Sequence, residues 1–388
     1  MRHAPGHTCP VSSLTADRVR SDVDVLSRAG LGLEDFLEEA TESVGRAVPW
    51  VAACVATHDP TTRIISSARK YGDLVGHNDQ DTLFARIEYG GEEPTAFQAL
   101  HGTNRTAVAM HVATGGEVER SARMAQLMKP YYGYLDETRM LFADGDSYWG
   151  SMAIFRGPDD PAFSAAEAAW IAELAPAFAR GVRIGILAAI GLAGTPADVT
   201  GLGPAVIILG ADDRVSQMSP AAQARLDQLL VDARTGDPLT MVTALAASAR
   251  RLARGEISTP PRVRVRATDG EWLVMHASPL SNATGGAGDV VITIEAARPP
   301  EIIDLVVAAF DLTAREREVT KLVIQGADTK EIAAALFLSP YTVQDHLRSI
   351  FDKAGVRSRR ELVARVYFDQ YAPRMNATLA PSGGFAAL

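Results

Sequence analysis

The C-terminal part of the sequence contains the segment Gly326-Ala-Asp-Thr-Lys-Glu-Ile-Ala-Ala-Ala-Leu-Phe-Leu-Ser-Pro-Tyr-Thr-Val-Gln-Asp-His-Leu347. Thr329 can cap one helix, and Ser339 followed by Pro340 is the favoured start of the next. Only two residues and the cap separate these helices. This spacing is typical of a helix-turn-helix, in which the second helix enters the major groove of DNA.

Further helix signals lie on both sides of this pair. The segments Thr313-Ala-Arg-Glu316 and Ser358-Arg-Arg-Glu361 are capping boxes, which open two more helices. Glycine at positions 326 and 355 stands where a helix should end. The sequence therefore predicts an all-α domain of four helices over residues 311–372.

One face of the third helix in this domain is expected to read DNA. If Val343 and Leu347 point into the core, the opposite face carries side chains that can bond base edges, because Gln pairs with adenine, Arg with guanine and Asp with cytosine. Basic residues near the helix ends could hold phosphates. We expect the DNA contacts to come from Lys330, Ser339, Tyr341, Thr342, Gln344, Asp345, Arg348, Lys353, Arg357 and Arg359.

The charge distribution agrees with a polyanionic partner for this domain alone. The chain has a net charge of −9, but residues 311–388 carry eleven Lys/Arg and nine Asp/Glu. The remaining 310 residues therefore hold the negative charge. Such asymmetry favours nucleic acid at the C-terminal end and disfavours it elsewhere.

Four segments resemble the LuxR/FixJ-type DNA-binding domain, and the match covers about sixty residues: Leu312-Thr-Ala-Arg-Glu-Arg-Glu-Val319, Gly326-Ala-Asp-Thr-Lys-Glu-Ile-Ala333, Leu338-Ser-Pro-Tyr-Thr-Val-Gln-Asp-His346 and Lys353-Ala-Gly-Val-Arg-Ser-Arg359. The resemblance implies a third helix that reads DNA and a last helix that dimerises. We expect dimer contacts from Val363, Val366, Tyr367 and Gln370. Asp345 departs from the family pattern, since its carboxylate would repel phosphate, so whether it contacts a base stays open.

The N-terminal half predicts an α+β domain over residues 29–190. Residues 51–58 and 64–68 are separated by the turn Asp59-Pro-Thr-Thr62, and a second such pair flanks Asp144-Gly-Asp146, so two hairpins are expected. A capped helix, with Pro176 as a possible kink, is expected from Ser164 to about Ile190. The segments Ala113-Thr-Gly-Gly, Arg120-Ser-Ala-Arg, Leu127-Met-Lys-Pro, Asp136-Glu-Thr-Arg and Trp149-Gly-Ser-Met resemble the GAF-like sensor regions of actinobacterial regulators.

Aromatic residues of this domain could line an effector site. The candidates are Trp50, Tyr89, Phe97, Tyr131 and Trp149, although a core also requires aromatics. The negative charge of the domain favours a neutral organic effector. The relatives often have His-Gly-Phe where this chain has Tyr132-Gly-Tyr134, which suggests a ligand of its own.

The domain boundaries follow from composition and from the order of strand and helix signals. The fold class is multidomain: an α+β GAF-like domain, an α+β PAS-like domain recognised by element order alone, and an all-α four-helix LuxR-type helix-turn-helix domain. The expected division is a flexible N-terminus at 1–28, the GAF-like sensor at 29–190, a linker at 191–203, the PAS-like domain at 204–298, a linker at 299–310, the DNA-binding domain at 311–372 and a flexible tail at 373–388.

Composition excludes several other classes of protein. Two cysteines cannot form a disulfide framework or a thiolate cluster, and the longest apolar run is about half of the ~20 residues that cross a bilayer. We expect a cytoplasmic protein without metal, cofactor or membrane contact. Its partners would be operator DNA, a small neutral effector, a second copy and RNA polymerase.

Two alternatives to a ligand-controlled regulator are less consistent with the sequence. A GAF-fold enzyme or a redox sensor would use Cys54, which alternates with apolar neighbours and is more typical of a buried thiol. A phosphorylated response regulator is excluded, because the N-terminal block lacks the alternating strands and helices of a receiver domain.

Overall fold

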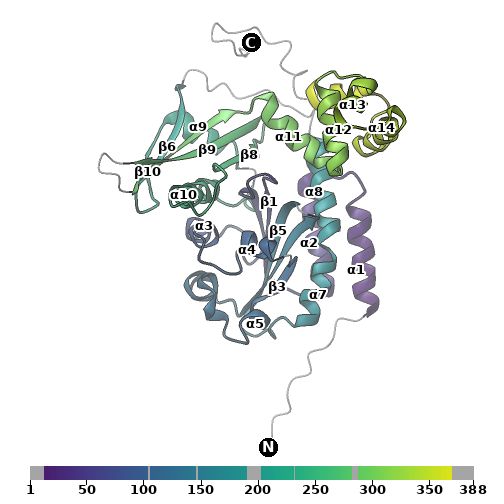
Figure 1. The fold of residues 1–388 in the computed structure, drawn as a ribbon. Helices are drawn as coiled ribbons and strands as arrows, with labels where there is room; N and C mark the ends of the chain where they lie inside the picture. Colours follow the sequence, from purple (N-terminus) through teal and green to yellow (C-terminus); the bar gives the residue numbers. More distant parts are fainter. Residues whose placement is uncertain are drawn as a thin grey trace, which may run out of the picture. The chain divides into compact units, whose positions relative to one another are not determined.

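The computed structural model describes residues 13–103, 105–145, 147–189, 202–230, 232–281 and 287–368. They form two compact units (Figure 1). The first holds two β-sheets with their helices. The second holds residues 269–272 and the helices that follow residue 296.

The first sheet is antiparallel and has the strand order β2-β1-β5-β4-β3. Its strands are β1 (Ala52–His58), β2 (Ile65–Gly72), β3 (Ala107–Ala109), β4 (Asp136–Asp144) and β5 (Ser147–Arg156). The β1–β2 and β4–β5 pairs are the two expected hairpins. A β-bulge interrupts the second, because Phe142 pairs with Gly150 while Ala143 pairs with Tyr148.

Helices cover both faces of this sheet (Figure 1). One face carries α1 (Ser13–Leu26), α2 (Leu33–Ala47), α7 (Ala165–Glu173) and α8 (Ala175–Ala189). Phe178 of α8 packs there against Phe36 and Phe142. The shorter elements are α3 (Asp81–Tyr89), α4 (Phe97–Gly102), α5 (Met110–Ala113), η1 (Val118–Arg120), η2 (Met124–Met128) and α6 (Lys129–Tyr132).

Two expectations for this module need correction. Residues 13–26, placed in a flexible terminus, form α1, which packs on α2 and buries Val19 and Val23. The long helix after Ser164 is two helices. The capping box of Ser164 with Glu167 is present, but α7 ends before Pro176, whose ring cannot donate the backbone hydrogen bond of a continuous helix.

The second sheet has the strand order β7-β6-β10-β9-β8, which repeats the order of the first sheet position by position. Its elements are β6 (Ala205–Leu209), β7 (Val215–Met218), α9 (Pro220–Asp227), α10 (Leu239–Ala253), β8 (Arg262–Arg266), β9 (Trp272–Ser281) and β10 (Ala287–Ala296). Helix α10 is buried along most of its length and packs on α3 of the first module. The two sheet modules therefore share a core.

The second unit consists of helices. They are α11 (Pro299–Ala309), α12 (Ala314–Ile324), α13 (Thr329–Leu336), α14 (Pro340–Ala354), α15 (Arg359–Val363) and η4 (Ala364–Phe368). The caps at Thr313, Ser339 and Ser358 are confirmed, and Gly355 ends α14 with a left-handed conformation. The cap of α13 is Asp328 and not Thr329, because the Asp328 carboxylate accepts from two backbone amides.

The fold class is confirmed: the chain is multidomain, with two α+β modules and a helical C-terminal domain. One linker was misplaced, because residues 299–309 form helix α11, which Pro299 and Pro300 open at the positions where proline is favoured. The linker expected at 191–203 lies mostly outside the described residues, and the tail expected at 373–388 lies entirely outside them.

Candidate functional site

Helix α14 is held by buried anchors along one side and by caps at both ends. Val343, Leu347 and Ile350 are buried and pack against α12 and α13. The Ser339 hydroxyl accepts from the amide of Thr342 at 3.0 Å. These anchors fix the rotation of α14 about its axis, and so they decide which side chains are exposed.

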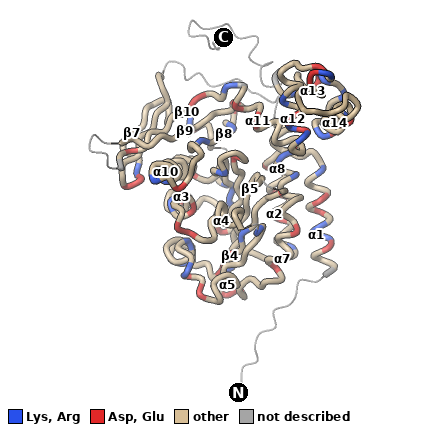
Figure 2. The backbone as a smooth tube through the Cα atoms, viewed as in Figure 1, with Lys and Arg blue, Asp and Glu red and all other residues tan. Residues whose placement is uncertain are grey.

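The opposite side of α14 is the face that the sequence predicted. Tyr341, Gln344, Asp345 and Arg348 are all exposed, with 74% of the Arg348 side chain accessible. Figure 2 shows charges of both signs on the C-terminal helices. Polar side chains at four-residue spacing on one exposed face can reach neighbouring base edges.

Arg348 and Asp345 form an exposed ion pair with an N–O distance of 3.3 Å. Pairs this accessible contribute little stability, because water screens them and two long side chains must be held in place. The Arg348 guanidinium can therefore exchange this carboxylate for a base or a phosphate at small cost.

Lys353 has a structural partner. Its ammonium donates to Glu316 at 2.7 Å, and the Ser349 hydroxyl donates to the same carboxylate at 2.6 Å. Burial opposes ionisation of Glu316, but these bonds and the Thr313 amide outweigh it and lower the pKa of Glu316 to about 2. The pair ties the start of α12 to the end of α14.

The other expected DNA contacts lie at helix ends. Lys330 and Arg357 are exposed, Thr342 and Arg359 are half-buried, and Ser339 is occupied as a cap. Phe337, in the turn before α14, is 95% exposed and has a φ of 54°. A left-handed backbone conformation is unfavourable for a bulky residue such as phenylalanine.

One of the four expected dimer contacts is not on a free surface. Val366 is fully buried, because η4 packs on α11, so it cannot face a second copy. Val363 is half-buried. The Tyr367 side chain and all of Gln370 lie outside what the structure describes.

A cavity of about 50 Å³ lies in the first unit, beside the sheet face that α3 covers. Its walls are mainly apolar. They include Ile65, Phe84, Tyr89, Phe97, Leu127, Met128, Tyr132 and Phe155, and α10 of the second module adds Thr240.

Two of the five aromatics expected around an effector, Tyr89 and Phe97, line this cavity. Trp50, Tyr131 and Trp149 do not. Tyr131 is exposed while its neighbour Tyr132 lines the cavity, since one step along a helix rotates the side chain by about 100°. The bulge in β5 places Tyr148, and not Trp149, in the cluster around Phe97.

The charged groups at the cavity already have partners. Lys70 donates to Asp81, to Asn78 and to the carbonyl of His77, so all three of its protons are used. Glu88 accepts from the amide of Phe97 at 2.6 Å and from Arg139 at 2.8 Å.

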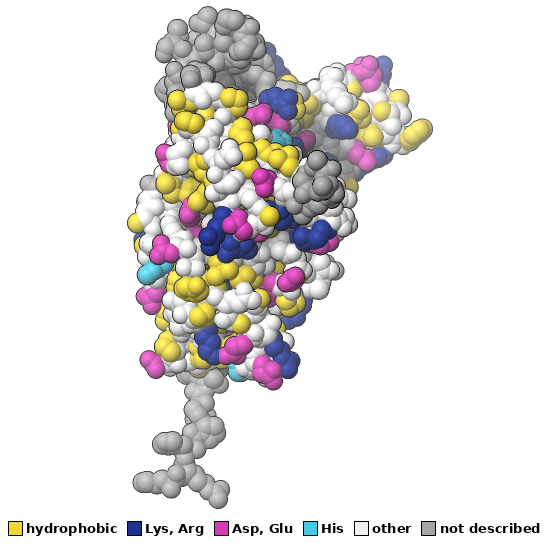
Figure 3. Space-filling view, turned by 90° about the vertical axis from the view of Figure 1, so that its left-hand side faces the viewer, with side chains coloured by type: hydrophobic (Ala, Val, Ile, Leu, Met, Phe, Trp, Pro, Cys, Tyr) yellow, Lys and Arg dark blue, Asp and Glu magenta, His cyan; other side chains and the backbone are white. Residues whose placement is uncertain are grey.

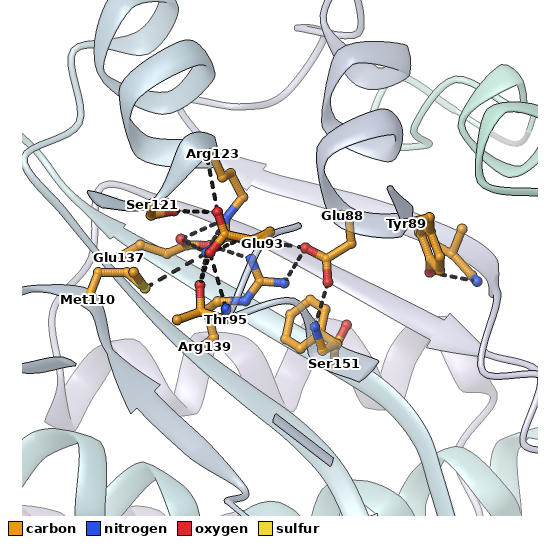
Figure 4. Close-up of polar contacts among 12 residues, drawn as sticks. Glu88, Tyr89, Glu93, Thr95, Met110, Ser121, Arg123, Glu137, Arg139 and Ser151 are labelled. Carbon is orange, nitrogen blue, oxygen red and sulfur yellow. Dashed lines mark hydrogen bonds and ion pairs between the residues drawn. The ribbon is translucent and has the colours of Figure 1, made fainter. Parts of the chain in front are cut away.

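Glu88 continues into a buried ionic network of three glutamates and two arginines (Figure 4). Arg123 contacts Glu137 at 2.7 Å, and Arg139 bridges Glu137 and Glu88. Glu93 accepts from the Ser121 hydroxyl at 2.9 Å. Glu88, the network residue that lines the cavity, is therefore held in place by its bonds to the other members.

Two reactive side chains of the cavity are held in their neutral forms. Burial raises the pKa of the Cys54 thiol to about 11, which disfavours the reactive thiolate that a redox sensor needs. Burial also lowers the pKa of His58 to about 4, although the Arg63 carbonyl opposes this. His58 is therefore a neutral hydrogen-bond partner of Ser151, at 2.9 Å.

The described residues also bear on three other kinds of site. On the face drawn in Figure 3, described basic and acidic side chains are interspersed, so a polyanion finds no broad positive surface there. Among the described residues, no three His, Cys, Asp or Glu side chains are grouped as metal ligands. No described helix is long and apolar enough to span a membrane.

A family model matches the C-terminal helices. Residues 311–366 match the model of "Bacterial regulatory proteins, luxR family". The spore germination protein GerE of Bacillus subtilis is 46% identical over 55 residues, which are 14% of this chain and 74% of that protein. A putative HTH-type transcriptional regulator of Mycobacterium bovis is 50% identical over 52 residues, which are 13% of this chain and 6% of that protein.

A solved GAF domain from a phosphotransferase of Coxiella burnetii aligns with 44% of this chain and 95% of its own, at 12% identity and a TM-score of 0.30.

Proposed function

The chain belongs to the luxR family of bacterial regulatory proteins, and we propose that it is a one-component transcriptional regulator that binds operator DNA through α14. The observation that carries the proposal is the exposed face of this helix. Its polar side chains point away from three buried anchors, and its caps leave no freedom to rotate. A helix fixed in this way can present the same side chains to every operator.

The side chains expected to contact DNA have different roles in this proposal. Gln344 and Arg348 read bases, since Gln bonds adenine and Arg bonds guanine bidentately. Lys330, Arg357 and Arg359 hold phosphates near the helix ends. Tyr341, at the start of α14, contacts the backbone or a thymine methyl.

The regulator binds as a homodimer. One domain of this size offers few base contacts, and a symmetric pair doubles them on an inverted repeat with half-sites about one helical turn apart. Val363 and Tyr367 on the last helix, and the surface of α7 and α8, are the candidate interfaces. Light scattering that gives a monomer both free and on operator DNA would contradict this part.

The N-terminal module senses a small neutral organic molecule in its cavity. A ligand can shift DNA binding only by the difference in its affinity for two arrangements of the chain, typically about 1–3 kcal/mol. DNA must then change the affinity for the ligand by the same factor.

Selection of binding sites from random DNA, followed by titration of the full chain, tests the proposal. We expect an enriched inverted repeat, and we expect metabolite fractions from the host to shift its affinity. Enrichment of no sequence would refute operator binding. A metabolite that binds with equal affinity in the presence and absence of DNA would refute sensing and leave DNA recognition standing.

A further inference from the structure

We propose that the cavity binds a small uncharged molecule carrying one hydrogen-bonding oxygen, and that Thr240 of α10 holds this oxygen. The ligand site is then composite, because the first sheet module supplies the apolar walls and the second supplies the polar contact. The composite site deepens the proposed function. It rests on that function only for the effect of the ligand on DNA affinity.

Thr240 lines the cavity and has a buried, unused hydroxyl. The residue is 5% exposed, it lines the cavity, and its Oγ1 has no hydrogen-bond partner among the described residues. Buried polar atoms are nearly always bonded, so one that is not indicates a missing partner. A ligand oxygen would supply that partner.

Thr240 is held in place by the segment before α10. The Lys70 amide donates to the Arg234 carbonyl at 2.8 Å, and the Gly236 amide donates to the Ala68 carbonyl at 3.0 Å. These bonds add the segment to the edge of β2. The position of Thr240 is therefore defined by the sheet that forms the cavity.

A second contact fixes the turn into α10. The Asp237 amide donates to Asp81 at 2.9 Å, and the side-chain amide of Asn78 donates to the Thr235 carbonyl at 3.1 Å. Asp81 is also the carboxylate that neutralises Lys70. The same residue thus lines the cavity and joins it to the second module.

The chemical class of the ligand follows from the remaining walls. Lys70, Asp81 and Glu88 are paired, so a charged ligand would be buried without a counter-ion, which is strongly unfavourable. A fully apolar ligand would leave Thr240 unsatisfied. An alcohol or a ketone meets both conditions.

The size of the ligand follows from the volume. About 10–15 Å³ of such space holds one water-sized group, so about 50 Å³ accommodates roughly three to five such groups. 1-Butanol and butanone are suitable probes of this size. Butyrate and butylammonium have similar size and carry the charges that the cavity disfavours.

Ligand-observed NMR titrations of the full chain without DNA test the proposal. We expect saturable binding of 1-butanol and butanone, and much weaker binding of butyrate and butylammonium. Thr240→Val, which keeps the shape and removes the hydroxyl, should weaken binding of both neutral probes about fivefold, as expected for one lost hydrogen bond.

Thr41→Val is the matched control. Thr41 lies on α2, its hydroxyl is also buried without a partner, and it does not line the cavity. This variant should bind both probes as the wild type does. Thermal unfolding should show both variants folded, because each loses only an unpaired hydroxyl.

Three results would overturn the proposal: equal binding of the neutral probes to wild type and Thr240→Val, tighter binding of butyrate or butylammonium than of butanol, or no binding of any neutral probe. None of these results would contradict the proposal that the chain binds operator DNA. If the probes bind through Thr240 but leave DNA affinity unchanged, the composite site stands and the proposed sensing function fails.

Discussion

The buried ionic network of the N-terminal module and the exposed ion pair of α14 lie in opposite environments. Arg123 has a side chain that is 0% exposed and bonds Glu137 at 2.7 Å, whereas the Arg348 side chain is 74% exposed and lies 3.3 Å from Asp345. Both are arginine–carboxylate pairs. Removal of a buried partner leaves an uncompensated charge in a medium of low dielectric constant, while removal of an exposed one leaves a charge in water.

This difference separates structural from functional charge in the molecule. The buried pairs cannot exchange partners without opening the core, so they hold Glu88 at the cavity in one position. The exposed pair exchanges partners readily, so it is available to DNA. The predictions below test this contrast, first in the buried region and then on α14.

Arg123→Met should cause the largest loss of stability, about 3–5 kcal/mol in the free energy of unfolding, because Glu137, Glu88 and Glu93 lose their shared cation. Denaturant unfolding measures it. Arg254→Met, at an exposed position on the end of α10, is the control and should change stability by less than about 0.5 kcal/mol. Similar losses in the free energy of unfolding for both variants would show that the stability contributed by these charges does not depend on burial.

His58 should make the first unit sensitive to acid. Its folded pKa, about 4, lies below the unfolded value of about 6.5, so the unfolded chain takes up the proton first as the pH falls. The contribution of neutral His58 to the free energy of unfolding is fully present above pH 6.5. It decreases by up to about 3 kcal/mol as the pH falls from 6.5 to about 4. Denaturant unfolding of wild type and His58→Gln across this pH range should show that the difference between their free energies of unfolding narrows. A constant difference would contradict the lowered pKa of His58.

Lys353→Met should lower the stability of the second unit by about 1–2 kcal/mol at neutral pH, because Glu316 loses its cation. The folded pKa of Glu316 is lowered to about 2, so its contribution is present above pH 4.5 and disappears as the pH falls toward 2. Chemical unfolding at several pH values measures this. Lys330→Met, at an exposed site, should have no comparable effect, and equal effects would argue against a structural role of Lys353.

Asp345→Asn should have the smallest effect, a gain in DNA affinity of about 0.3–1 kcal/mol that shrinks with added salt, because one carboxylate no longer repels phosphate. Fluorescence anisotropy at two salt concentrations is a suitable assay. A loss of affinity confined to operators with cytosine at one position would instead identify Asp345 as a base-reading residue.

The C-terminal domain was predictable because its signals are local. Helix caps such as Thr313, Ser339 and Ser358 act within three residues, and the exposed face of α14 follows from helical periodicity. The exception was Val366, whose burial depends on α11, more than fifty residues earlier in the chain.

The cavity was only partly predictable because its walls come from distant segments. Tyr89 and Phe97 were found by residue type, but a bulge in β5 determines which of Tyr148 and Trp149 faces Phe97, and no local pattern shows it. Thr240 was missed for the same reason. It reaches the cavity through backbone pairing between residues 68 and 236, which only the folded chain reveals.

Titration of the full chain against its selected operator and the single-base variants of that operator, with wild type and Arg348→Ala, is the most direct test of the role of α14. We predict about tenfold or greater loss for Arg348→Ala on the operator and relaxed preference at one base pair, while Arg254→Ala binds as the wild type does. An equal loss on every DNA sequence would show that Arg348 contacts only phosphates, and no loss at all would show that the exposed face of α14 does not read DNA.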